Sequence, residues 1–232
     1  MCTSTADFRY LQFKQKVHFF SKSFMCEVNE SIAVVIKFSK CSCDHSFNPK
    51  ASRYKPLNLS VASKIISAVP GSKHVVALPE MFSTGFSMAP ERMAEKMDGA
   101  SVNWMVAIAA KHRCILTGSL IIEDDGNYYN RMLWVQPNGQ IGTYDKRHLF
   151  AHAGEDKHYT HGDRKFIASV NGWRIKLLIC YDLRFPVWAR NQGDEYDVLL
   201  NVANWPQVRS LAWKTLLQAR AIENQCYAVG VN

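Results

Sequence analysis

The sequence lacks an apolar run of the roughly twenty residues that a membrane-spanning helix needs. It also lacks internal repeats and low-complexity tracts, so nothing in it favours a repeat architecture. Of its 232 residues 47% are hydrophobic and 21% are charged, as in ordinary globular proteins. We therefore predict one sizeable globular core and no membrane partner.

Paired cysteines and metal-binding motifs are lacking too. The chain has 7 cysteines, an odd number, and is too long to need a disulfide framework, which favours a reducing compartment with the cytoplasm as the default. Cys41 and Cys43 have no second cysteine pair to complete a zinc site. Four histidines lie close together in the sequence, but their spacing matches no common ligand pattern. They are His148, His152, His158 and His161. We therefore predict no metal and no cofactor.

The net charge of +8 first suggests a nucleic-acid partner. Residues 1–57, however, hold nine Lys/Arg against four Asp/Glu, so most of the excess lies at this end of the chain. We interpret residues 1–55 as an atypical N-terminal segment, with a candidate first strand near residues 32–38, and predict no nucleic-acid partner. An organellar transit peptide is the alternative for this basic, serine-containing start.

Apolar periodicity and turn residues predict an α/β fold. Helices are expected at Leu57–Ala68, Ser101–His112 and Val208–Ile222, and strands at Val75–Leu78, Cys114–Ile122, Tyr128–Val135, Trp173–Ile179, Tyr196–Asn201 and Cys226–Val231. Hairpins between helical units favour two packed sheets with helices outside. The last helix is expected to bury one apolar face, comprising Val208, Leu211, Ala212, Leu216, Ala219 and Ile222.

Cys180 ends the apolar strand Trp173–Ile179, which places its side chain at a sheet edge, where α/β folds often carry their chemistry. The alternative is a buried structural cysteine. Glu80 and Lys146 likewise follow strand-like segments, with a loop carboxylate and a solvated cation as their alternatives. Together the three supply a nucleophile, a base and a cation for an oxyanion, as acyl transfer requires.

Five stretches carry a resemblance to a known family: PEMFSTGFSM, YDKRHLF, CYDLRFPVWARN, NVANWP and ARAIENQ. They resemble the nitrilase (carbon-nitrogen hydrolase) superfamily and are most similar to its omega-amidase branch. The resemblance covers roughly residues 75–232. It implies a four-layer α-β-β-α sandwich, a domain at residues 56–232 that lacks the family's C-terminal strands, and pairing as a homodimer.

The resemblance also implies a reaction. Cys180, Glu80 and Lys146 would form the catalytic triad, Glu155 would be the second active-site glutamate, and the substrate would be a small 2-oxo acid amide such as 2-oxoglutaramate. The alternatives are another superfamily amidase or carbamoylase, such as a deaminated glutathione amidase, and a non-catalytic binding protein.

A carboxylate on the substrate requires a cation. Arg184 is the first candidate, with Arg147 and Lys214 after it, and the alternative for Arg184 is an ion pair with Asp182. Three aromatic residues are expected to line a small substrate site; they are Phe86, Tyr181 and Trp205.

Overall fold

The structure is a computed structural model that describes residues 17–18, 34–35, 51–68 and 74–232, with side chains described from residue 55 onward. The predicted N-terminal segment therefore lies mostly outside the described residues. Only Val34–Val35 of the candidate first strand is described, and it forms β2. No helix within the described ranges is long and apolar enough to cross a bilayer.

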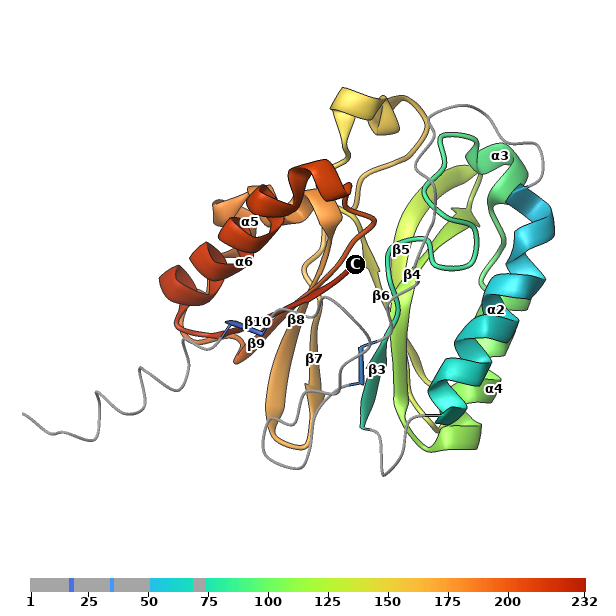
Figure 1. The fold of residues 1–232 in the computed structure, drawn as a ribbon, viewed down its shortest axis with the longest axis horizontal. Coiled ribbons are helices and arrows are strands. Elements are labelled where there is room, and N and C mark those ends of the chain that lie inside the picture. Colours follow the sequence, from blue (N-terminus) through green and yellow to red (C-terminus); the bar gives the residue numbers. More distant parts are fainter. Residues whose placement is uncertain (1–16, 19–33, 36–50, 69–73) are drawn as a thin grey trace, which may run out of the picture.

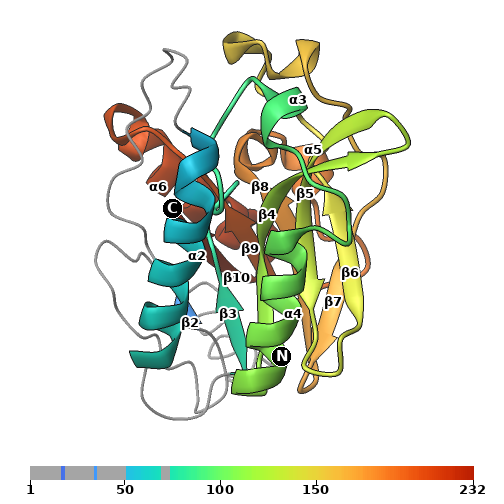
Figure 2. The ribbon, with the colours of Figure 1, turned by 90° about the vertical axis from the view of Figure 1, so that its right-hand side faces the viewer.

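Two sheets pack face to face with helices on their outer sides, which gives the predicted four-layer α-β-β-α sandwich (Figure 1). One sheet has the strand order β2-β3-β4-β5-β6, and the other has the order β1-β10-β9-β8-β7. Helices α2 and α4 lie side by side over the first sheet (Figure 2), and α5 and α6 cover the second. Both sheets mix parallel and antiparallel pairs, as the predicted hairpins require.

The elements have the following bounds. The strands are β1 Val17–His18, β2 Val34–Val35, β3 Val75–Ala77, β4 Ile115–Asp124, β5 Asn127–Val135, β6 Ile141–Asp145, β7 Ile167–Val170, β8 Trp173–Ile179, β9 Val198–Val202 and β10 Tyr227–Val231. The α-helices are α2 Ala51–Ala68, α3 Pro90–Met93, α4 Ala100–His112, α5 Pro186–Ala189 and α6 Ser210–Asn224. Short 3-10 helices are η1 Ala151–Ala153, η2 Glu155–Lys157, η3 Cys180–Arg184 and η4 Gln207–Arg209.

The predicted hairpins are confirmed: β4 pairs antiparallel with β5, and β5 with β6. Asp125 and Gly126 both have positive φ, 49° and 76°, which is the backbone of the tight turn that joins two twisted antiparallel strands. Strand β8 has the predicted bounds. Helix α2 begins at Ala51 rather than Leu57.

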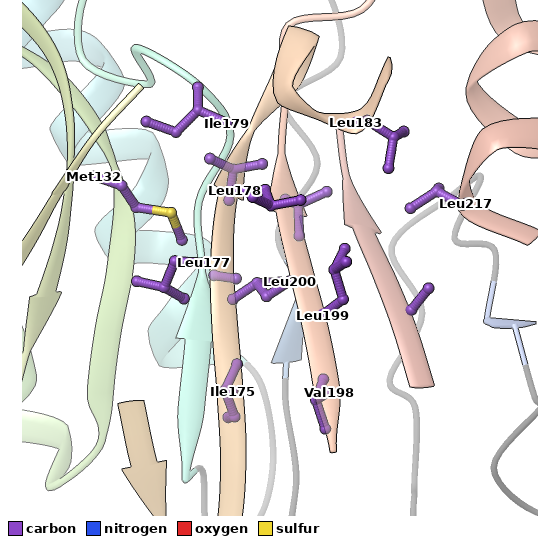
Figure 3. Packing of buried hydrophobic residues seen from close by; sticks show 14 of the residues in the cluster. Met132, Ile175, Leu177, Leu178, Ile179, Leu183, Val198, Leu199, Leu200 and Leu217 are labelled. Carbon is purple, nitrogen blue, oxygen red and sulfur yellow. The ribbon is translucent and has the colours of Figure 1, made fainter. Parts of the chain in front are cut away.

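Apolar side chains of β8 and β9 build a core on both faces of their sheet (Figure 3). Leu177 and Ile179 point towards Met132 in the facing sheet, whereas Leu199 lies on the side of Leu217 in α6. Because β8 is held on both faces, the residue at its carboxyl end is rigidly placed.

The predicted apolar face of α6 is wrong in part: Ala212 and Leu216 are half-buried and pack against the core, but three other members do not. Val208, Leu211 and Ile222 are 91%, 78% and 58% exposed, although they were expected in the core. The helix buries a different face, which comprises Trp213, Leu217, Arg220, Ala221 and Asn224.

Two contacts under α6 explain why it buries this face. Gly230 in β10 has no side chain, and a Cβ there would lie 2.5 Å from Leu217 and 2.7 Å from Trp213, so these two residues approach the strand closely. On the same face, Arg220 donates from Nε to the carbonyl of Leu183 at 3.0 Å, which satisfies a buried cation that periodicity alone assigns to solvent.

Candidate active site

The ends of three strands bring the predicted catalytic residues together. Lys146 follows β6 directly, and Glu80 lies just beyond β3 in the same sheet, whereas Cys180 follows β8 in the facing sheet. The backbone N–H of Glu80 donates to the carbonyl of Ala203 at 3.3 Å, which ties the two sheets at this point. Glu155 comes from η2, in the loop after Lys146.

The turns at these strand ends have unusual backbone conformations. Cys180 has φ 46°, and Met81, next to Glu80, has φ 47°. A residue other than glycine rarely adopts this left-handed region, and such strain concentrates at functional sites. The turn at Met81 is fixed because its N–H donates to Ser119 Oγ at 2.8 Å.

Lys146 is the centre of a buried ionic cluster. Its Nζ lies 2.9 Å from Glu80 Oε1 and 2.8 Å from Glu155 Oε2, and all three side chains are fully buried. Glu155 Oε2 also accepts from the N–H of Phe150 at 2.6 Å. Charges buried this deeply are stable only when each is paired and hydrogen-bonded, so this cluster requires all of its members.

The cluster determines the charge states of the lysine and the thiol. Burial opposes a charged Lys146, but the carboxylates of Glu155 and Glu80 outweigh it, and the pKa of Lys146 is well above its ordinary value. Burial raises the pKa of the Cys180 thiol, and the charge of Glu80 raises it further. The thiol is therefore protonated at neutral pH, and a base is needed to convert it into a thiolate.

Asp182 holds the turn that carries Cys180. Its Oδ2 accepts from the N–H of Ile179 at 3.0 Å and from the hydroxyl of Tyr144 at 2.7 Å. Its Oδ1 accepts from the N–H of His148 at 2.8 Å and lies 2.9 Å from the ring Nδ1 of the same residue. The expected alternative, an ion pair between Asp182 and Arg184, is therefore wrong: these donors occupy the carboxylate.

Two of the three predicted aromatic residues lie at this cluster. The ring centroid of Phe86 is 5.6 Å from Lys146 Nζ, and Tyr181 directly follows Cys180. Trp205 is mainly a core residue, and its indole N–H donates to the carbonyl of Arg209 at 2.9 Å.

Two arginines share these aromatic surfaces. The guanidinium of Arg184 lies 5.2 Å from the ring centroid of Trp205 and 5.9 Å from that of Tyr181. The guanidinium of Arg209 lies 5.4 Å from the ring centroid of Phe150. Neither forms an ion pair with a carboxylate in the part of the chain that the structure describes.

Sequence reasoning missed Asn130 and the positioning role of Asp182. Asn130 lies in β5, and its Nδ2 donates to Glu80 Oε1 at 2.8 Å and to Glu155 Oε1 at 3.2 Å. The sequence did offer a clue to Asn130: it lies within the strand-forming stretch Tyr128–Val135, and asparagine is depleted in strands. Asp182 gave no such signal, because nothing in a sequence distinguishes a buried loop carboxylate from an exposed one.

Residues 47–232 match the family model described as carbon-nitrogen hydrolase. The chain is 46% identical to the omega-amidase YafV of Escherichia coli over 177 residues, which cover 76% of this chain and 68% of that protein. It is 36% identical to the 2-oxoglutaramate amidase of Bacillus subtilis over 167 residues, which cover 69% of this chain and 64% of that protein.

A solved structure supports the same assignment. The crystal structure of XC1258 from Xanthomonas campestris, described as a CN-hydrolase superfamily protein with an arsenic adduct in the active site, has a TM-score of 0.73 and 41% sequence identity. The match covers 76% of this chain and 70% of that one.

Proposed function

Because this chain belongs to the carbon-nitrogen hydrolase family, we propose that it is a thiol amidohydrolase that releases ammonia from the terminal amide of small 2-oxo acid amides such as 2-oxoglutaramate. The observation that carries the proposal is the buried Glu80–Lys146–Glu155 cluster beside the Cys180 thiol. The substrate class follows from the similarity to an omega-amidase and to a 2-oxoglutaramate amidase.

Acylation of the thiol is the first half of the reaction. As Cys180 Sγ forms a bond to the amide carbon, Glu80 takes the thiol proton. The carbonyl oxygen becomes an oxyanion, which the Lys146 ammonium and the backbone N–H of Tyr181 stabilise. When the tetrahedral intermediate collapses, the C–N bond breaks and Glu80 returns the proton to nitrogen, so that ammonia leaves and a thioester remains.

Hydrolysis of the thioester is the second half. Glu80 takes a proton from water as the water oxygen attacks the thioester carbon, and Lys146 again stabilises the oxyanion. The C–S bond then breaks, the acid product leaves, and Glu80 returns the proton to the Cys180 sulfur. Glu155 keeps the lysine in place throughout, because both of its oxygens lie within 3.0 Å of Lys146 Nζ.

We propose that Arg184 and Arg209 bind the substrate carboxylate. Of the three cations suggested by the sequence, Arg147 donates to the carbonyl of Gly162 at 3.0 Å, and Lys214 is exposed on α6. Arg184 lies against Tyr181, next to the nucleophile, and has no carboxylate partner among the described residues. Arg209, which the sequence analysis did not single out, lies over Phe150, whose N–H holds Glu155.

Ammonia release from a substrate panel tests this function. We expect the chain to prefer 2-oxoglutaramate to glutamine and to simple neutral amides of similar length. Arg184→Met and Arg209→Met should each raise the KM for 2-oxoglutaramate about tenfold or more, the effect of losing one charge-assisted hydrogen bond, while hydrolysis of a neutral amide is unchanged.

Lys214→Met is the matched control for the two arginine variants and should keep the parental KM. Equal rates on charged and neutral amides would contradict the proposed substrate class and favour another amidase of the family. If only Lys214→Met raised the KM, the substrate carboxylate would bind at Lys214 on α6 and not at the two arginines.

We also propose that two copies pair through the outer face of α6 and the adjoining η4, because Val208 in η4 and Leu211 and Ile222 in α6 expose apolar surface there. Leu211→Glu is expected to convert a dimer into a monomer, since it places a charge within an apolar interface. Light scattering during gel filtration measures the mass. Leu57→Glu, a similar change at an exposed leucine on the opposite outer layer, should leave the dimer intact; a monomeric parent would refute the proposal.

A further inference from the structure

Asn130 is a buried polar residue within an apolar part of β5. Only 1% of its surface is exposed, and it lies opposite Ile121 in the antiparallel ladder with β4. The strand residues that follow Arg131 towards the end of β5 are apolar and buried. A buried asparagine in such a strand requires hydrogen-bond partners that offset its loss of hydration.

Those partners are the charged groups of the proposed site. Asn130 Nδ2 donates to Glu80 Oε1 at 2.8 Å and to Glu155 Oε1 at 3.2 Å, so one amide group bridges both carboxylates. The backbone carbonyl of Asn130 accepts from the N–H of Lys146 at 3.0 Å. One residue therefore contacts the base, the second glutamate and the lysine.

The orientation of this amide is determined by charge. Turning it over would place Oδ1 against two carboxylate oxygens, which repel it, so the NH₂ group must face the glutamates. In that orientation Asn130 Oδ1 is buried and has no hydrogen-bond partner within the described residues. The amide therefore contributes to the cluster through its NH₂ donors and not through its oxygen.

The Glu80 carboxylate receives three hydrogen-bond donors, one of which is the Asn130 amide. Oε1 receives Lys146 Nζ at 2.9 Å and Asn130 Nδ2 at 2.8 Å, and Oε2 receives the N–H of Asn204 at 2.8 Å. A carboxylate offers about four acceptor positions, so these donors leave one position open. That position is available for the proton exchanged with Cys180, water and ammonia.

We propose that Asn130 is a positioning residue that bridges Glu80 and Glu155 through its side-chain amide and thereby keeps one acceptor position of Glu80 directed at the reacting atoms. The inference rests on the proposed function, in which Glu80 is the proton carrier. It adds a fifth side chain to Cys180, Glu80, Lys146 and Glu155, the four that the sequence analysis identifies.

Two variants test this role. Asn130→Asp keeps the shape but replaces the donor with a third carboxylate, and Asn130→Ala removes the amide. We expect kcat to fall on the order of 100-fold in both, with KM near the parental value, because misplacing a catalytic group by about 1 Å has an effect of this size. The acid limb of the pH profile of kcat/KM should move to higher pH, most in Asn130→Asp.

Alkylation of Cys180 by iodoacetamide gives a second readout that needs no substrate. In Asn130→Asp the rise of the alkylation rate with pH should move to higher pH, because the added negative charge opposes thiolate formation. Thr117→Val is the matched control. It removes a buried hydroxyl of the neighbouring strand β4 that has no hydrogen-bond partner in the described part of the chain, and it should keep both profiles.

Each outcome decides between the two roles. Parental kcat and parental pH profiles in both variants would overturn the proposal. So would failure of both variants to fold, or folded variants that lose only melting temperature, because Asn130 would then be a structural residue. A parental chain that releases no ammonia from any amide would refute the proposed function instead, and the alkylation profile would still report on Asn130.

Discussion

Cys180→Ala is expected to lower ammonia release from 2-oxoglutaramate by at least about 10⁴-fold, the scale seen when a covalent nucleophile is removed. Without the sulfur no thioester forms, and Lys146 and Glu80 cannot replace it because both are fixed in the buried cluster. The fold should persist, since the change removes one atom at a partly exposed position. Single-turnover ammonia release and a thermal melt on the same preparation measure both quantities.

Other variants separate a nucleophile from a merely buried thiol. Cys180→Ser keeps the size and one hydrogen bond but should remain nearly inactive, because a hydroxyl is a poorer nucleophile for this attack than a thiol. Cys114 and Cys226 are buried elsewhere in the structure, and Cys114→Ala and Cys226→Ala should keep the parental rate. Turnover by Cys180→Ala at the parental rate would remove the thiol from the mechanism.

Much of this site was predictable because strand ends are visible in sequence. Strand β8 begins and ends where its apolar run does, so Cys180 was placed correctly at the edge of a sheet. Glu80 also follows an apolar segment, whereas Lys146 follows β6, whose sequence IGTYD is mixed in polarity. The structure places the Cys180 thiol beside the cluster of Glu80, Lys146 and Glu155. Their meeting point could not be derived from periodicity, because it depends on how two sheets face each other. The resemblance to a family supplied that step.

The remaining features depend on contacts that leave little trace in a sequence. Helix α6 has apolar residues on two faces, and the side that is buried depends on Gly230 and on the Arg220 contact with the backbone of η3. Asn130 and Asp182 are short polar residues, and their roles come from partners far away in the chain. Local patterns therefore located the charged groups of the proposed site. They did not locate the Asn130 amide and the Asp182 carboxylate, which hold parts of that site in place.

Lys146→Met is the second change with a large expected effect, and it should act on both rate and stability. Removing the cation that stabilises the oxyanion is expected to lower kcat by roughly 10²–10³-fold. It also leaves Glu80 and Glu155 buried without their shared partner. Breaking a buried ion pair in this way typically costs about 3–5 kcal/mol of unfolding free energy. Ammonia release and urea unfolding at pH 7 measure the two losses.

The pH dependence of the unfolding free energy follows from the direction in which the pKa of Lys146 is shifted. The pKa of Lys146 is raised in the folded state, so its stabilising contribution is complete below about 10.5, the ordinary value, and is lost only as pH rises through the folded value. The stability difference between parent and variant should therefore stay constant from pH 7 to pH 9.

A second substitution separates the two effects of losing Lys146. Adding Glu155→Gln to Lys146→Met removes one of the two unpaired charges, so it should recover part of the unfolding free energy. It cannot restore the rate, because no ammonium remains to stabilise the oxyanion. If the double variant recovered activity in step with stability, Lys146 would be needed only for folding, and the oxyanion would have to be held by backbone N–H groups alone.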